Sequence, residues 1–146
     1  MIAHFDHVTI VVNDVESAKS FFALLGFAEQ QTVVISGDKF STYMGVADIE
    51  AEHVTLALSN ASPRLEIQLL HYRHPDPIQD PNVARLNKIG FNHICLAVDD
   101  IDAEVAKLSA HGIKMRNEIM QFHDRKLVFI SGPEGVTVEL AEWAKH

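Results

Sequence analysis

The sequence predicts an α+β fold in which two repeated modules, each with a βαβββ order, form a cup-shaped half-barrel. The first observation is a repeat, because "FDHVTIVVND" at residues 5–14 and "FNHICLAVDD" at 91–100 share Phe, His, Val and Asp at the same places. The second is its extent: in both copies a glycine follows the histidine by 19 positions, without a gap. The third is that both copies then continue as strand-like segments broken by turns. Such self-similarity defines the structural unit of a fold.

Each copy is predicted to open with a strand that runs into a helix. Apolar residues alternate along each first strand, which places the histidines on the opposite face. Asp14 and Asp100 stand where helix N-caps belong, and apolar residues follow at helical spacing. Gly26 and Gly112 then close the helices, each of about three turns.

The rest of each copy predicts three strands. The strand-like segments are "FAEQQTVVIS", the region around "YMGVADIE" with "HVTLALSN", and "RLEIQLLHY" in the first copy, then "IKMRNEIMQF", "KLVFIS" and "VTVELAEW" in the second. Three prolines between the copies indicate a linker with one short helix over 82–88. We expect one domain over 1–146, with modules at 4–74 and 91–143 and the linker at 75–90.

Composition narrows the classes of function. The 146 residues are 47% hydrophobic and carry a net charge of −8, with no block of Lys or Arg. Nucleic acids and anionic membranes are therefore not expected as partners, because both require clustered cations. No apolar run reaches the length of a membrane helix, about 18 residues. With Cys95 as its single cysteine, the chain is expected to be soluble and cytoplasmic.

The two last strands supply the remaining candidate site residues. Aligning "LEIQLLHY" (65–72) with "VTVELAEW" (136–143) places Gln68 over Glu139, both on the face away from the helix. Each module thus offers one histidine and one amide or carboxylate. Such groups bind borderline divalent cations, namely Zn, Ni, Co, Fe or Mn. The candidate ligands are His7, Gln68, His93 and Glu139.

Other side chains compete for these roles. A lone histidine on a strand is more often structural than a ligand, and only the repeated pairing favours the metal site. Glu66 shares the face of Gln68 and would replace it if the register moved by two residues. Cys95 lies on the face of His93 and is expected to serve packing. Histidines without a counterpart in the repeat are expected to be solvated or to cap helices: His4, His53, His71, His74, His111, His123 and His146.

The pairs "DHVTIVV…GF" and "NHICLAVDD…GI", closed by "PEGVTVELAEW", resemble the vicinal oxygen chelate superfamily of glyoxalase, bleomycin-resistance and dioxygenase proteins. The resemblance covers nearly the whole chain. It implies a glyoxalase-like cup of paired βαβββ modules whose metal ligands come from the first and last strands. Carried over to this chain, these ligands are His7, Gln68, His93 and Glu139, with Glu139 also the catalytic base.

The resemblance implies a divalent-metal-dependent lyase or isomerase whose small substrate chelates the metal through vicinal oxygens. Gln68 departs from the Glu that is usual in the lactoylglutathione lyase branch, whereas Gln occurs in the methylmalonyl-CoA epimerase branch. That branch also has a carboxylate on a middle strand, and "HVTLALSN" lacks one at the inward place. A ring-cleaving Fe(II) dioxygenase and a non-catalytic antibiotic-binding protein are the alternatives. Exposed sheet edges favour a homodimer.

Overall fold

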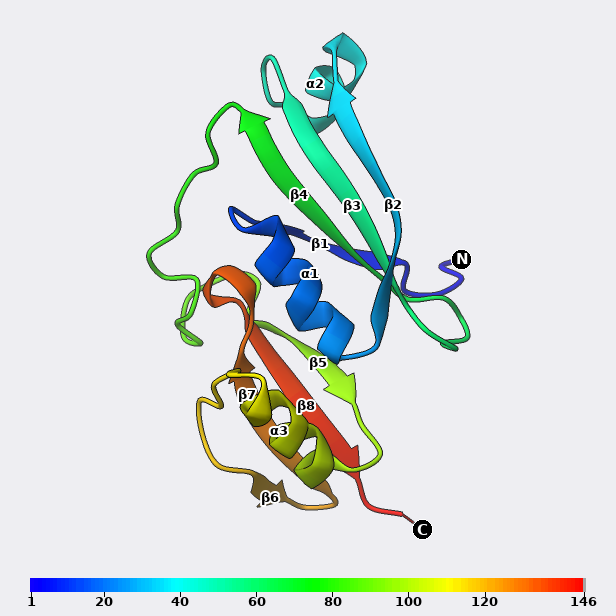
Figure 1. The fold of residues 1–146 in the computed structure, drawn as a ribbon, viewed down its shortest axis with the longest axis vertical. Coiled ribbons are helices and arrows are strands. Elements are labelled where there is room, and N and C mark those ends of the chain that lie inside the picture. The colour runs from blue at the N-terminus through cyan, green and yellow to red at the C-terminus, as the bar shows by residue number, and fades with distance from the viewer. Residues whose placement is uncertain (146) are drawn as a thin grey trace. The chain divides into compact units, whose positions relative to one another are not determined.

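The computed structural model describes residues 1–145, which form two four-stranded sheets and three α-helices (Figure 1). The chain divides into two compact units, unit 1 from Met1 to Gln79 and unit 2 from Asp80 onward. The predicted α+β class is therefore confirmed, although neither sheet closes into a barrel. No helix within residues 1–145 is long and apolar enough to cross a membrane.

Unit 1 contains two helices and four strands, and the strands form one sheet. Its elements are β1 (His7–Val11), α1 (Val15–Leu24), β2 (Phe27–Ser36), α2 (Asp38–Met44), β3 (Glu50–Leu58) and β4 (Glu66–His74). The sheet order is β1-β4-β3-β2, with β1 parallel to β4 and the other pairs antiparallel. Helix α1 packs against β2 and β4.

Unit 2 repeats this topology. Its elements are β5 (His93–Ala97), α3 (Ile101–Ala110), β6 (Met120–Phe122), β7 (Arg125–Ser131), a 3₁₀ turn η1 (Pro133–Gly135) and β8 (Thr137–Trp143). The order β5-β8-β7-β6 again places the first strand parallel to the last. The order of one strand, one helix and three strands thus recurs, as the sequence repeat predicted.

Both long helices begin at the predicted caps. The Asp14 carboxylate accepts a hydrogen bond from the Ser17 amide at 3.0 Å, and Asp100 accepts one from the Ala103 amide at 3.0 Å. These bonds satisfy amides that have no partner within the helix. Just past the helix ends, Gly26 and Gly112 have φ values of 96° and 81°, which residues with a Cβ rarely adopt.

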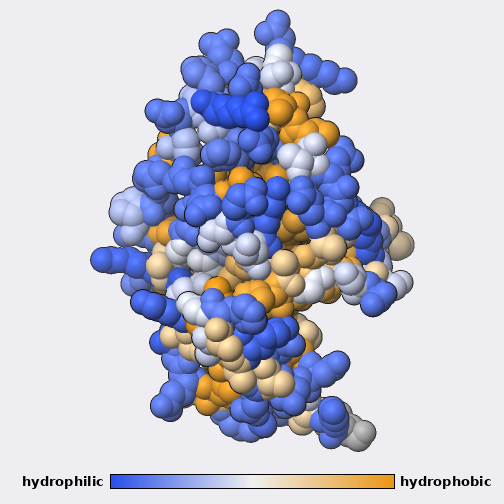
Figure 2. Space-filling model, viewed as in Figure 1, coloured by the Kyte–Doolittle hydropathy of each residue, from blue (hydrophilic) through white to orange (hydrophobic). Residues whose placement is uncertain are grey.

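The two faces of each sheet differ as the period of two predicts. On the side of α1, Ile67 and Leu69 are buried, and on the side of α3, Val138 and Leu140 are buried. The opposite faces hold the candidate site residues. On the face of Figure 2, most exposed residues are hydrophilic, with hydrophobic ones between them. Burial against the helices therefore determines which side chains each sheet leaves open.

Three details differ from the expectations. The region around "YMGVADIE" includes part of helix α2, bracketed by Gly37 and Gly45 with φ values of 94° and 69°. Past this helix, Ile49 is buried in a small apolar cluster. Residues 82–88 form turns rather than a helix, because the bonds of Val83 and Arg85 span only three residues. Strand β6 is also short. The division into one domain with a linker at 75–90 stays a prediction.

Candidate metal centre

Strand pairing in unit 1 brings the predicted ligands to one face. His7 pairs with Glu66 and Thr9 pairs with Gln68 across the parallel β1/β4 ladder. Side chains of paired residues point to the same side of a sheet, and so do residues two apart. His7 and Gln68 therefore share the face away from α1.

Unit 2 has the same register. His93 pairs with Thr137 and Cys95 pairs with Glu139 across the parallel β5/β8 ladder. Position by position, Glu139 therefore corresponds to Gln68, as the alignment of the last strands predicted. The register does not favour Glu66, whose counterpart in unit 2 is Thr137.

Both candidate histidines use Nδ1 for a bond to the preceding residue. Nδ1 of His7 lies 2.6 Å from the Asp6 carboxylate, and Nδ1 of His93 lies 2.6 Å from Oδ1 of Asn92. The carboxylate is an acceptor, so Nδ1 of His7 carries the proton, and this bond lowers the pKa of Asp6. Asn92 uses its amide nitrogen to bind the Leu86 carbonyl at 2.6 Å, which turns its oxygen toward His93. In both rings Nε2 is the nitrogen available for a cation.

In unit 2 this nitrogen faces a carboxylate. Nε2 of His93 lies 3.3 Å from Oε1 of Glu139, and the His93 ring stands edge-on to Phe129 with centroids 5.1 Å apart. With Nδ1 donating to Asn92, the ring needs a proton or a cation on Nε2 to face Glu139 favourably. This requirement fits a site for a positive ion.

Cys95 is exposed, whereas it was expected to pack in an apolar strand. Its side chain is exposed because it lies on the same open face of the sheet as His93. The protein around its sulfur still desolvates the thiol, which raises its pKa to about 11, and a hydrogen bond to Glu139 adds to the shift. At neutral pH the thiol therefore stays protonated as a donor to Glu139.

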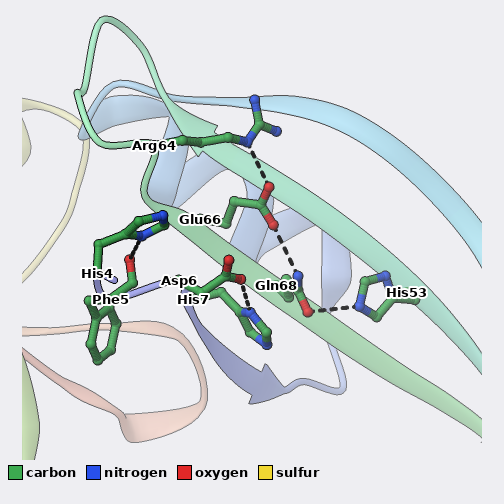
Figure 3. A network of polar contacts seen from close by, with 8 residues as sticks. All are labelled: His4, Phe5, Asp6, His7, His53, Arg64, Glu66 and Gln68. Atoms are coloured by element: carbon green, nitrogen blue, oxygen red, sulfur yellow. Dashed lines mark hydrogen bonds and ion pairs between the residues drawn. The ribbon is translucent and has the colours of Figure 1, made fainter. Parts of the chain in front are cut away.

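In unit 1 the Gln68 amide lies within a chain of polar contacts (Figure 3). Its nitrogen donates to Oε1 of Glu66 at 3.0 Å, and its oxygen lies 3.0 Å from Nε2 of His53. Arg64 donates to Oε2 of Glu66 at 2.7 Å and is the main cause that lowers the pKa of this carboxyl. Glu66 thus contacts Gln68 directly.

His53 contacts the candidate site, and the sequence interpretation did not single it out. It was expected to be solvated or capping, but it lies on β3 beside Gln68, because β3 and β4 pair with Thr55 opposite Gln68. The alternation of "HVTLALSN" was the available signal. His111 does bind the Lys107 carbonyl at the end of α3, at 2.8 Å. His4, His74 and His123 are exposed as expected, His71 is half-buried, and His146 lies outside the described residues.

The four predicted ligands thus form two half-sets, His7 with Gln68 in unit 1 and His93 with Glu139 in unit 2. Within residues 1–145, no three His, Cys, Asp or Glu side chains are grouped to hold a metal ion. Each unit alone supplies one imidazole and one amide or carboxylate.

Comparison with known proteins establishes the family. Residues 6–129 match the family model described as "Glyoxalase/Bleomycin resistance protein/Dioxygenase superfamily". The chain belongs to this superfamily. The vicinal oxygen chelate resemblance and the glyoxalase-like fold are thereby confirmed.

Individual relatives are more distant. The chain is 27% identical to the uncharacterized protein YaeR of Escherichia coli, with 93% of both chains covered. It is 25% identical to a lactoylglutathione lyase of Pseudomonas putida, covering 94% of this chain and 84% of that protein. A solved glyoxalase family protein from Bacillus cereus superposes with a TM-score of 0.89 at 27% identity, covering 99% and 97% of the two chains.

Proposed function

We propose that the protein is a divalent-metal-dependent lyase or isomerase of the glyoxalase type. Its substrate would be a small molecule that chelates the ion through two neighbouring oxygens. The observation that carries the proposal is that His7 and His93 make the same kind of contact in their own units. Nδ1 of each ring lies 2.6 Å from a side-chain oxygen of the preceding residue, which leaves Nε2 for a cation. The lactoylglutathione lyase similarity supports the same class of reaction.

The donor set fits such an ion. Two imidazole nitrogens from His7 and His93, an amide oxygen from Gln68 and a carboxylate oxygen from Glu139 suit Zn, Ni, Co, Fe or Mn. A bound ion would supply Lewis acidity toward the substrate oxygens, which is worth several kcal/mol. Among the four proposed ligands only Glu139 carries a charge. Together with a divalent ion the site would therefore have a net charge of about +1, which favours an anionic substrate.

Glu139 is the proposed base. It accepts a hydrogen bond from the Cys95 thiol and lies 3.3 Å from Nε2 of His93, so a thiol that keeps its proton already lies beside it. It also borders a small hollow of about 50 Å³ with mostly apolar walls, among them Phe122 and Phe129. In an isomerase, Glu139 would take a proton from one substrate carbon and return it to the neighbouring one.

The test is an activity screen with a matched pair of variants. Candidate reactions are isomerisation of hemithioacetals, epimerisation of acyl-CoA esters and oxygen uptake with catechols. Glu139→Gln should lower kcat by about 10²- to 10⁴-fold, whereas Glu118→Gln, at an exposed position of unit 2, should not. Oxygen uptake with catechols would instead indicate the dioxygenase, and binding without turnover would indicate the antibiotic-binding class.

We further propose a cytoplasmic homodimer. Strands β1 and β2 end one sheet and β5 and β6 end the other, and edge residues such as Val11 and Val34 are exposed. Such edges favour continuation across a dimer axis. Light scattering on the purified chain tests the dimer. Mixing His7→Ala with His93→Ala should restore metal binding only if the half-sets that share an ion belong to two chains.

A further inference from the structure

Each hydrogen bond in the polar chain around Gln68 has a donor that can be assigned, and the bonds converge on Glu66. The Arg64 guanidinium donates to Glu66, the Gln68 nitrogen donates to Glu66, and the Gln68 oxygen lies 3.0 Å from Nε2 of His53 (Figure 3). A carboxylate accepts and does not donate, so the end of the amide that faces Glu66 is its NH₂ group. The end that faces His53 is therefore the oxygen, and His53 is the donor.

An amide ligand has a problem that a carboxylate lacks. Its two ends have almost the same shape, but only the oxygen has lone pairs for a cation, so a half turn of the side chain removes the ligand. The two oxygens of a carboxylate are equivalent, and the same half turn changes nothing. Gln68 therefore requires neighbours that distinguish its ends, whereas Glu139 does not.

The strand registers show this difference between the units. In unit 2 the position equivalent to Glu66 is Thr137, which is buried and bound by Arg116. The position equivalent to His53, two residues along the ladder, is Leu127. Acceptor and donor thus flank the amide in unit 1, and a threonine and a leucine flank the carboxylate in unit 2.

We infer that Glu66 and His53 are positioning residues that hold the Gln68 amide in one orientation, with Oε1 as the ligating atom. An amide oxygen has two lone pairs, so one can accept the His53 bond while the other remains for the cation. The metal role in this inference rests on the proposed function, but the orientation of the amide does not. Two arms of one experiment keep these parts separate.

The first arm uses metal-free protein and nitrogen-15 NMR. His53 should carry a proton on Nε2, and the Gln68 side-chain NH₂ should show shifts that Glu66→Thr changes strongly. A His53 ring protonated only on Nδ1 would overturn the inference, and so would Gln68 shifts that Glu66→Thr leaves unaltered. Neither result depends on whether the protein binds metal.

The second arm titrates Zn²⁺ into the full chain by calorimetry. His53→Leu, which installs the residue of unit 2, should weaken binding by about 10-fold, at the low end of what loss of a ligand's supporting partner costs. In a Gln68→Glu background the same change should cost less than about 3-fold, because a carboxylate needs no orientation. His111→Leu controls for loss of a surface histidine.

The outcomes separate the two proposals. Equal Zn²⁺ affinity for wild type and His53→Leu would overturn the positioning role while the metal site stands. Equal losses from His53→Leu in the Gln and Glu backgrounds would also overturn it, because the effect would then be general. Absence of Zn²⁺ binding by wild type would overturn the proposed function, and the NMR arm would still decide the orientation of the amide.

Discussion

Replacing Asp6 by Ala should weaken metal binding although Asp6 is not itself a ligand. In the wild type the Asp6 carboxylate lies 2.6 Å from Nδ1 of His7 and keeps the proton on that nitrogen, which leaves Nε2 for the cation. The substitution removes this acceptor. Loss of such a partner typically costs 10- to 100-fold in affinity. Because the Asp6 side chain is 73% exposed and that of His7 is 38% exposed, water can replace part of the bond. We therefore expect about 10-fold, at the lower end of that range.

The matched variant is Asp6→Asn, which keeps an acceptor oxygen at the same place and removes the charge. It should cost about 3-fold or less, as expected for an exposed charge in water. Zn²⁺ calorimetry at constant pH measures both variants, with His7→Ala as the reference for loss of the ligand. If Asp6→Ala binds as tightly as wild type while His7→Ala does not bind, the reasoning about the Nδ1 partner is refuted.

Three further predictions concern stability and thiol chemistry. Asp100→Ala should destabilise unit 2 by about 1 kcal/mol in urea unfolding, because the N-cap of α3 is lost. The control Asp99→Ala should change the free energy of unfolding by close to zero. Equal effects of the two variants would contradict the capping role. Leu140→Ala removes a side chain that is 0% exposed and should lower the free energy of unfolding by about 2 to 5 kcal/mol. A loss below about 1 kcal/mol in the same urea unfolding experiment would contradict its place in the core. Because the pKa of Cys95 is raised to about 11, alkylation by iodoacetamide should be slow at pH 8 and still rise roughly tenfold per pH unit up to about pH 10. Glu139→Gln should move this profile to lower pH. A wild-type profile that levels off near pH 8.5 would contradict the raised pKa of Cys95.

Much of the fold was predictable because its signals are local. The alternation along β1 and β4 determines which face carries His7 and Gln68, and it needs only neighbouring residues to be recognised. The caps at Asp14 and Asp100 are local in the same sense. The repeat then transferred the assignment of one unit to the other, and the identical registers of β1/β4 and β5/β8 agree with it.

The parts that sequence reasoning missed depend on pairing between distant residues. His53 has no counterpart in the repeat, and its contact with Gln68 exists only because β3 and β4 pair in one register over a separation of 15 residues. Helix α2 was missed because its exposed side chains, such as Tyr43, show no apolar stripe. A pattern shared by both copies was visible, whereas features that belong to one copy were not.

The most direct test of the account is the metal content of protein purified without added metal. Wild type should contain one divalent ion per chain, because each chain supplies one half-set of each kind. His7→Ala and His93→Ala should each lose it, although the two residues lie in different units. Wild type that is free of metal and stable, or variants that both keep their ion, would contradict the claim that two half-sets hold one cation.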